Sequence, residues 1–137
     1  MKKYRVGNSF QESFNFVNEN PDWNIIHCIS INNKTKLPMI HAYAQKGLMC
    51  RDIDSDGKEV FIPSIVYEAI GNISKKVKYS IIEYIEIMLK HEKDEVSVYG
   101  CYTKEFCRIE NESRSKMRDM GLDIEDEDYS YLGDIYE

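Results

Sequence analysis

The stretch from Met39 to Ile53 constrains this chain most tightly, because it can be counted into a β-hairpin. Two β-prone runs flank the dipeptide Lys46-Gly47. A two-residue turn in which glycine supplies a positive φ is a standard connection between antiparallel strands. With Lys46-Gly47 as the turn, His41 is predicted to lie directly opposite Asp52.

Directly opposed residues share one face of an antiparallel pair, with Cβ atoms about 4.5–5.5 Å apart. A carboxylate at that distance can hold one imidazole nitrogen and stabilise the imidazolium, as the orienting group of a nucleophilic triad does. A cross-strand His–Asp pair on the protein surface is the simpler interpretation of the spacing alone. The hairpin therefore predicts that His41 and Asp52 meet, and leaves their role open.

The bulk composition narrows the class of protein. The 137 residues indicate one domain, or one domain with an appendage. The net charge is −6, and the segment 119–137 holds eight acidic residues and no Lys or Arg, so we expect no nucleic-acid partner. No run approaches the roughly 20 apolar residues of a membrane span. The basic start is followed by polar residues and is no signal peptide, so we expect a cytoplasmic protein that does not bind membranes.

The pattern of elements indicates an α+β fold. An N-terminal helix begins at Asn8 or Ser9, with Phe10, Phe14 and Val17 on one apolar face, and is expected to pack on a small antiparallel sheet, followed by C-terminal helices. Strands are predicted at 23–31, 39–45, 48–53 and 59–62, and short helices at 63–69 and 80–90. The second of these helices is expected to open with the capping box Ser80-Ile-Ile-Glu83 and to bury a stripe made of Ile81, Ile85, Met88 and Leu89. The segment 73–79 is ambiguous, 96–101 is a candidate strand, and 103–120 is helix-prone. We divide the chain into a core (1–100) and a helical, acidic extension (101–137).

The sequence gives little reason to expect a metal or cofactor site. The four cysteines (Cys28, Cys50, Cys101, Cys107) form no Cys-x-x-Cys pair, and the three histidines complete no zinc pattern, so reduced thiols are expected. The run Asp52-Ile-Asp-Ser-Asp-Gly57 imitates the start of a calcium-binding loop, but Pro63 stands where the last ligand, a bidentate Glu, is required. We expect an acidic turn and no metal or cofactor.

The candidate nucleophiles differ in their expected surroundings. His27 and Cys28 are neighbours on a strand and point to opposite faces, so they cannot pair. Cys50 shares the His41 face, but a thiol in mid-strand lacks activation by a helix N-terminus. Ser9 stands at a helix start, near unpaired N–H groups and the positive end of the dipole. Because the dipole is too weak to ionise a hydroxyl, Ser9 would depend on His41 as its base; an ordinary N-cap is the alternative.

The order of these pieces resembles the papain-like and transglutaminase-like cysteine hydrolases, including small bacterial and phage-encoded types. Those proteins begin with a Gly-x-Cys helix start, continue into a strand, and then carry His-Ala-Trp-x-Glu and an Asp on the next strand. This chain has Gly7-Asn-Ser9-Phe, the strand Trp23-Asn-Ile-Ile-His-Cys28, His41-Ala-Tyr-Ala-Gln45, and Asp52. The segments Tyr79-Ser-Ile-Ile-Glu-Tyr84 and Tyr99-Gly100 are also similar to the family. The resemblance covers residues 5–100.

The resemblance implies acyl transfer at an amide: peptide hydrolysis, deamidation or crosslinking of a protein or peptide. Residue 9 would attack the carbonyl, His41 would carry the proton and Asp52 would orient His41. The backbone N–H of residue 9, with Asn8 or Gln11 nearby, would stabilise the oxyanion.

The chain departs from the family at residue 9, where Ser replaces Cys, and at Tyr43 and Gln45. Three interpretations fit: a deliberate Cys→Ser change, a natural pseudoenzyme, or a serine that itself attacks. The competing function is a non-catalytic protein-binding module, such as a phage or bacterial effector or inhibitor. A third interpretation is a small domain in which the His41–Asp52 pair lies on the sheet without a functional role.

Overall fold

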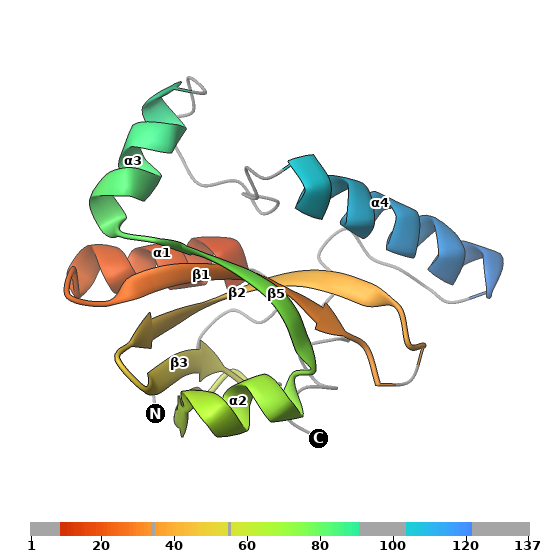
Figure 1. Ribbon diagram of the computed structural model, residues 1–137, viewed down its shortest axis with the longest axis horizontal. Helices are drawn as coiled ribbons and strands as arrows, with labels where there is room; N and C mark the ends of the chain where they lie inside the picture. The colour runs from red at the N-terminus through yellow and green to blue at the C-terminus, as the bar shows by residue number, and fades with distance from the viewer. Residues whose placement is uncertain (1–8, 34, 55, 91–103, 122–137) are drawn as a thin grey trace.

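The computed structural model describes residues 9–33, 35–54, 56–90 and 104–121 (Figure 1). Along the chain its elements are α1 (Ser9–Glu19), β1 (Asn24–Ile31), β2 (Pro38–Lys46), β3 (Met49–Ile53), β4 (Glu59–Pro63), α2 (Ser64–Ile70), β5 (Ile73–Tyr79), α3 (Ile81–Lys90) and α4 (Lys104–Asp119). The expected N-terminal helix, antiparallel sheet and later helices are all present. The α+β prediction is therefore confirmed.

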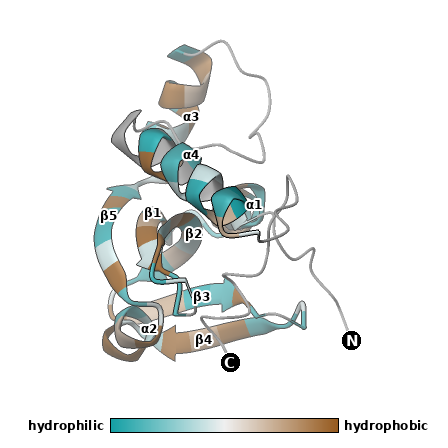
Figure 2. Ribbon diagram, turned by 90° about the vertical axis from the view of Figure 1, so that its right-hand side faces the viewer, coloured by the Kyte–Doolittle hydropathy of each residue, from teal (hydrophilic) through white to brown (hydrophobic). Residues whose placement is uncertain are grey.

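The five strands form one antiparallel sheet in the order β4-β3-β2-β1-β5. Helices α1, α3 and α4 lie on one side of it and α2 lies on the other, as Figures 1 and 2 both show. We call these two sides the three-helix face and the α2 face. Because side chains alternate along a strand, β1 contributes a different set of residues to each.

The two faces have separate apolar cores. On the three-helix face, Phe10 and Val17 of α1 pack with Ile25 and Ile29 of β1, and Tyr84 and Met88 of α3 join them. The expected apolar face of α1 is thus buried. On the α2 face the core is smaller and more polarisable, and consists of Ile26, Cys28, Tyr43, Cys50 and Tyr67.

The ambiguous segment 73–79 is a strand, β5, which pairs antiparallel with β1. Its buried end residue, Tyr79, lies in the core of the three-helix face. Lys76 and Lys78 pair with Cys28 and Ile26, so they project from the α2 face. The segment was ambiguous because most of its side chains stay exposed, which removes the usual hydrophobic alternation.

The hairpin forms where it was predicted, but its register was wrong by two residues. Gly47 and Leu48 are the turn residues, Lys46 pairs with Met49, and Gln45 pairs with Cys50. Gly47 has a φ of 57° and takes the first turn position, where a type II′ turn requires glycine. His41 and Asp52 are therefore diagonal neighbours rather than directly opposed. Because the shift is two residues, both side chains keep the same face.

The capping box predicted at the start of α3 is present. The Ser80 amide donates to Glu83 Oε1 at 2.9 Å, and the Glu83 amide donates to Ser80 Oγ at 3.1 Å. The predicted buried stripe was partly wrong. Met88 is buried as expected, but Tyr84 fills the core, whereas Ile85 and Leu89 are exposed. The helix is rotated so that its one large aromatic side chain reaches the sheet.

The helix expected at 103–120 is confirmed as α4, which contacts β2 and packs Ile109 against the core of the three-helix face. The candidate strand at 96–101, the Tyr99-Gly100 pair and the acidic tail beyond residue 121 lie outside the described residues. The division of the chain at residue 100 stays a prediction.

Among the described helices, none has the length and apolar character needed to cross a bilayer.

Candidate functional site

The candidate site lies where β2 and β3 separate. Their pairing extends only from Lys46 to Ala44 on β2. Beyond it, His41 Nε2 lies 2.6 Å from Asp52 Oδ2 across the widening gap. His41 is completely buried, and Asp52 is 5% exposed. The sequence-based pairing of these two residues is confirmed, although it forms diagonally.

Asp52 is held by three groups. Besides His41, the Tyr67 hydroxyl donates to Oδ2 at 2.5 Å, and the Ile53 amide donates to Oδ1 at 2.7 Å. Donors on both oxygens fix the orientation of the carboxylate and satisfy it in a buried environment. Asp52 in turn fixes the imidazole through Nε2, so Nδ1 is the nitrogen that would exchange a proton with a reacting group.

Tyr67 was not anticipated as part of this site. It lies on α2, 15 positions along the chain from Asp52. Its only sequence signal is that it is the large aromatic residue of a seven-residue helix. The centroid of its ring lies 4.4 Å from that of the Tyr43 ring. This contact packs α2 against the sheet next to Asp52.

Ser9 begins α1, as predicted, and α1 packs on the three-helix face, whereas the side chains of His41 and Asp52 lie on the α2 face. The backbone amide of Ala42, the residue after His41, donates to Ser9 Oγ at 3.2 Å. Ser9 is 7% exposed. Gln11 is partly buried in the first turn of α1, whereas Asn8 lies outside the described residues. The structure thus connects residue 9 to the backbone of β2, but Ser9 Oγ forms no hydrogen bond with His41 Nδ1.

A buried arginine ties α1 to the outer strands. Arg51 of β3 is bonded to Glu12 of α1 and donates to Glu59 of β4 at 2.8 Å. Its guanidinium also lies 4.1 Å from the centre of the Phe16 ring. Burial raises the pKa of Glu12 more than the bond to Arg51 lowers it. This cluster sets the position of the helix start relative to Asp52.

Neither described cysteine has the environment of a nucleophile. Cys28 lies directly opposite His41 in the β1–β2 pair, a proximity that sequence reasoning missed because the loop between these strands is too long to count across. Burial raises the pKa of Cys28 well above its usual value, and raises that of Cys50 to about 12. Both are therefore thiols, which are poor nucleophiles. Cys101 and the Cys107 side chain lie outside the described residues.

The acidic turn after Asp52 is closed by hydrogen bonds to one of its own carboxylates. Asp54 Oδ1 accepts from the amides of Asp56 and Lys58, each at 2.9 Å, so this carboxylate caps its own turn. Within the described ranges no three His, Cys, Asp or Glu residues gather as metal ligands would. The residues that resembled a calcium loop serve the turn and the His41 contact.

No known protein family, curated protein or solved structure matches this chain. The geometry of the site therefore carries the functional argument.

Proposed function

We propose that this protein is an acyl-transfer hydrolase of the papain-like or transglutaminase-like kind, with residue 9 as the attacking group. The observation that carries the proposal is the buried His41–Asp52 contact of 2.6 Å on β2, the strand whose Ala42 amide binds Ser9 at the start of α1. Helix N-termini supply backbone donors that stabilise an oxyanion, and a His–Asp pair supplies a base of fixed orientation.

In the proposed reaction, His41 Nδ1 removes the proton of residue 9 as that residue attacks an amide carbonyl of a protein or peptide. Asp52 stabilises the imidazolium, and Tyr67 and the Ile53 amide hold Asp52 in place. The backbone N–H of residue 9, with Gln11 or Asn8, faces the oxyanion. His41 then returns the proton to the leaving amine. A native cysteine at residue 9 would react as a thiolate; serine depends fully on His41.

The second candidate is a non-catalytic protein-binding domain that keeps the same framework. The limited exposure of Ser9 and its hydrogen bond from Ala42 favour it, because both hold the hydroxyl in a structural role. In that case the His41–Asp52–Tyr67 contacts serve only to join α2 to the sheet.

The variant Ser9→Cys separates the two candidates. The protein is treated with iodoacetamide at pH 6, and alkylation of the peptide that contains residue 9 is followed by mass spectrometry. If His41 activates this position, the introduced thiol reacts faster than free cysteine, because a His-paired thiol ionises at lower pH. The matched control is Ser9→Cys with Asp52→Asn, which should slow alkylation. A rate no faster than that of free cysteine contradicts the enzyme proposal and supports the binding domain.

A further inference from the structure

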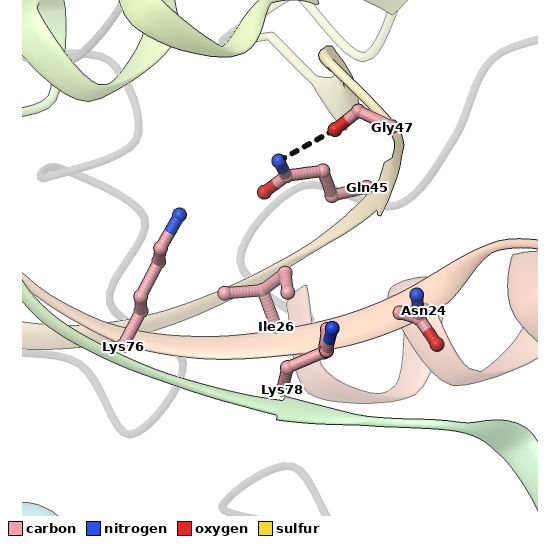
Figure 3. A pocket seen from close by; sticks show the side chains of 6 residues that line it. All are labelled: Asn24, Ile26, Gln45, Gly47, Lys76 and Lys78. Carbon is pink, nitrogen blue, oxygen red and sulfur yellow. Dashed lines mark hydrogen bonds between the residues drawn. The ribbon is translucent and has the colours of Figure 1, made fainter.

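A pocket of about 360 Å³ opens on the α2 face of the sheet, near the turn of the β2–β3 hairpin (Figure 3). Its volume falls within the usual range of small-ligand sites. Ile26 forms its apolar part, and the polar side chains around it come from three strands: Asn24 from β1, Gln45 from β2, and Lys76 and Lys78 from β5. None of these residues belongs to the candidate site around His41.

Two ammonium groups give the pocket a positive character. Lys76 Nζ lies 2.9 Å from Glu68 Oε1 of α2, which neutralises one of them. Lys78 adds a second ammonium on the same face of β5. Glu83 of α3 interacts electrostatically with Lys78, and its Oε1 also accepts a hydrogen bond from the Ser80 amide in the capping box. Both ammonium groups line the pocket and neither carboxylate does, so the pocket wall itself offers hydrogen-bond donors to an anion.

Gln45 supplies a buried acceptor. Its Nε2 donates to the Gly47 carbonyl at 2.9 Å, which orients the amide. Its Oε1 is buried and accepts no hydrogen bond in the structure. Figure 3 shows Gln45 and Lys76 extending into the same space above Ile26. Buried acceptors are normally satisfied, so this oxygen indicates a ligand that brings a donor.

We propose that this pocket binds an organic carboxylate that carries a hydrogen-bond donor close to its acid group. The carboxylate accepts from Lys78 and Lys76, and the donor meets Gln45 Oε1. A glutamate or aspartate residue of a peptide has this chemistry, because its backbone N–H is the donor. A free amino-dicarboxylic acid has it too. The site is independent of Ser9, so it holds for either candidate function.

The ligand class is tested by NMR titration of the full chain with four probes. Blocked glutamate (acetylated and amidated) and free glutamate should bind saturably. Blocked glutamine should bind at least about tenfold more weakly, since a charged hydrogen bond is lost. Glutarate, which lacks the donor, should also be weaker. Tighter binding of blocked than of free glutamate assigns the site to peptides, and the reverse assigns it to free acids. Equal binding of blocked glutamate and glutamine, or no saturable binding, overturns the proposal.

Matched lysine variants locate the site. Lys78→Gln should weaken binding of blocked glutamate about tenfold. Lys75→Gln removes the same charge from the same strand, but Lys75 pairs with Ile29 and projects from the three-helix face, so it should leave affinity unchanged. Gln45→Met should abolish the preference for glutamate over glutarate. Equal losses of affinity in the two lysine variants would show that net charge, and not this pocket, explains the binding, and would reject the proposal.

Discussion

Two buried histidines on neighbouring strands have opposite surroundings. His27 and His41 are both completely buried. His27 lies on the three-helix face among the rings of Phe10, Tyr79 and Tyr84, at centroid distances of 4.7, 5.1 and 5.4 Å. Neither of its ring nitrogens has a hydrogen-bond partner in the structure. His41 lies on the α2 face and is bonded to Asp52.

This difference shows that burial alone says little about the role of a histidine. Loss of hydration lowers the pKa of His27 to about 3, so its ring stays neutral and acts as an aromatic core residue. His41 has a carboxylate that can stabilise its charged form. Only the second environment suits proton transfer, and three measurements can test that contrast, in decreasing order of expected effect.

The largest effect is expected for Asp52→Ala, which removes the partner of both His41 and Tyr67. The change leaves the buried His41 Nε2 and Tyr67 hydroxyl without this acceptor, at a cost of about 1–3 kcal/mol for each group. Urea unfolding at pH 7 measures the loss. Asp52→Asn keeps the shape and one acceptor, and should lose less. A loss below about 1 kcal/mol for Asp52→Ala would mean that the contact is no more important than a surface pair.

A matched tyrosine pair tests whether Tyr67 supports Asp52. Tyr67→Phe removes one hydrogen bond to a charged group and should cost about 1.5–3 kcal/mol. Tyr43 is equally buried and packs against Tyr67, but its hydroxyl has no hydrogen-bond partner in the structure. Tyr43→Phe should therefore be neutral or slightly stabilising. Equal losses in the two variants would show that packing, and not the bond to Asp52, explains the burial of Tyr67.

The smallest effect concerns the pH dependence contributed by His27. Its folded pKa of about 3 lies below the ordinary 6.5, so the unfolded chain binds a proton that the folded protein excludes. Stability is therefore unaffected above pH 6.5 and falls as pH decreases toward 3, by about 1.4 kcal/mol per pH unit.

His27→Leu should remove this dependence. Between pH 7 and pH 5 the native protein should lose about 2 kcal/mol more than the variant, as measured by urea unfolding at both pH values. Carboxylates titrate in both proteins and cancel in the comparison. An identical loss in the two proteins would show that His27 is not the group responsible.

Local patterns predicted most of the elements. The spacing of Phe10, Phe14 and Val17 indicates α1 because helical neighbours recur every three to four residues. Ser80 and Glu83 mark the start of α3 because their side chains satisfy the free amides of its first turn. Where exposure hides the pattern, as in β5, or where several apolar faces compete, as in α3, the same reasoning gave an ambiguous or partly wrong answer.

The site was predicted less completely than the elements. Alternation along strands kept His41 and Asp52 on one face even though the turn position was wrong, since an error of two residues does not change the face. The placement of Cys28 opposite His41, and the bond from Tyr67, depend on long-range pairing that no local spacing encodes. The proposed roles of Ser9, His41 and Asp52 stay predictions for the alkylation experiment.

The sequence by itself determined the order of the helices and strands, the residues that share a face, and the presence of a His–Asp pair on one face of the hairpin. These properties follow from backbone periodicity and capping, which act over a few residues. Only the tertiary structure decided the hairpin register, the partners of Asp52 and the environments of the two histidines. Those depend on which surfaces pack together, and packing joins residues that are distant along the chain.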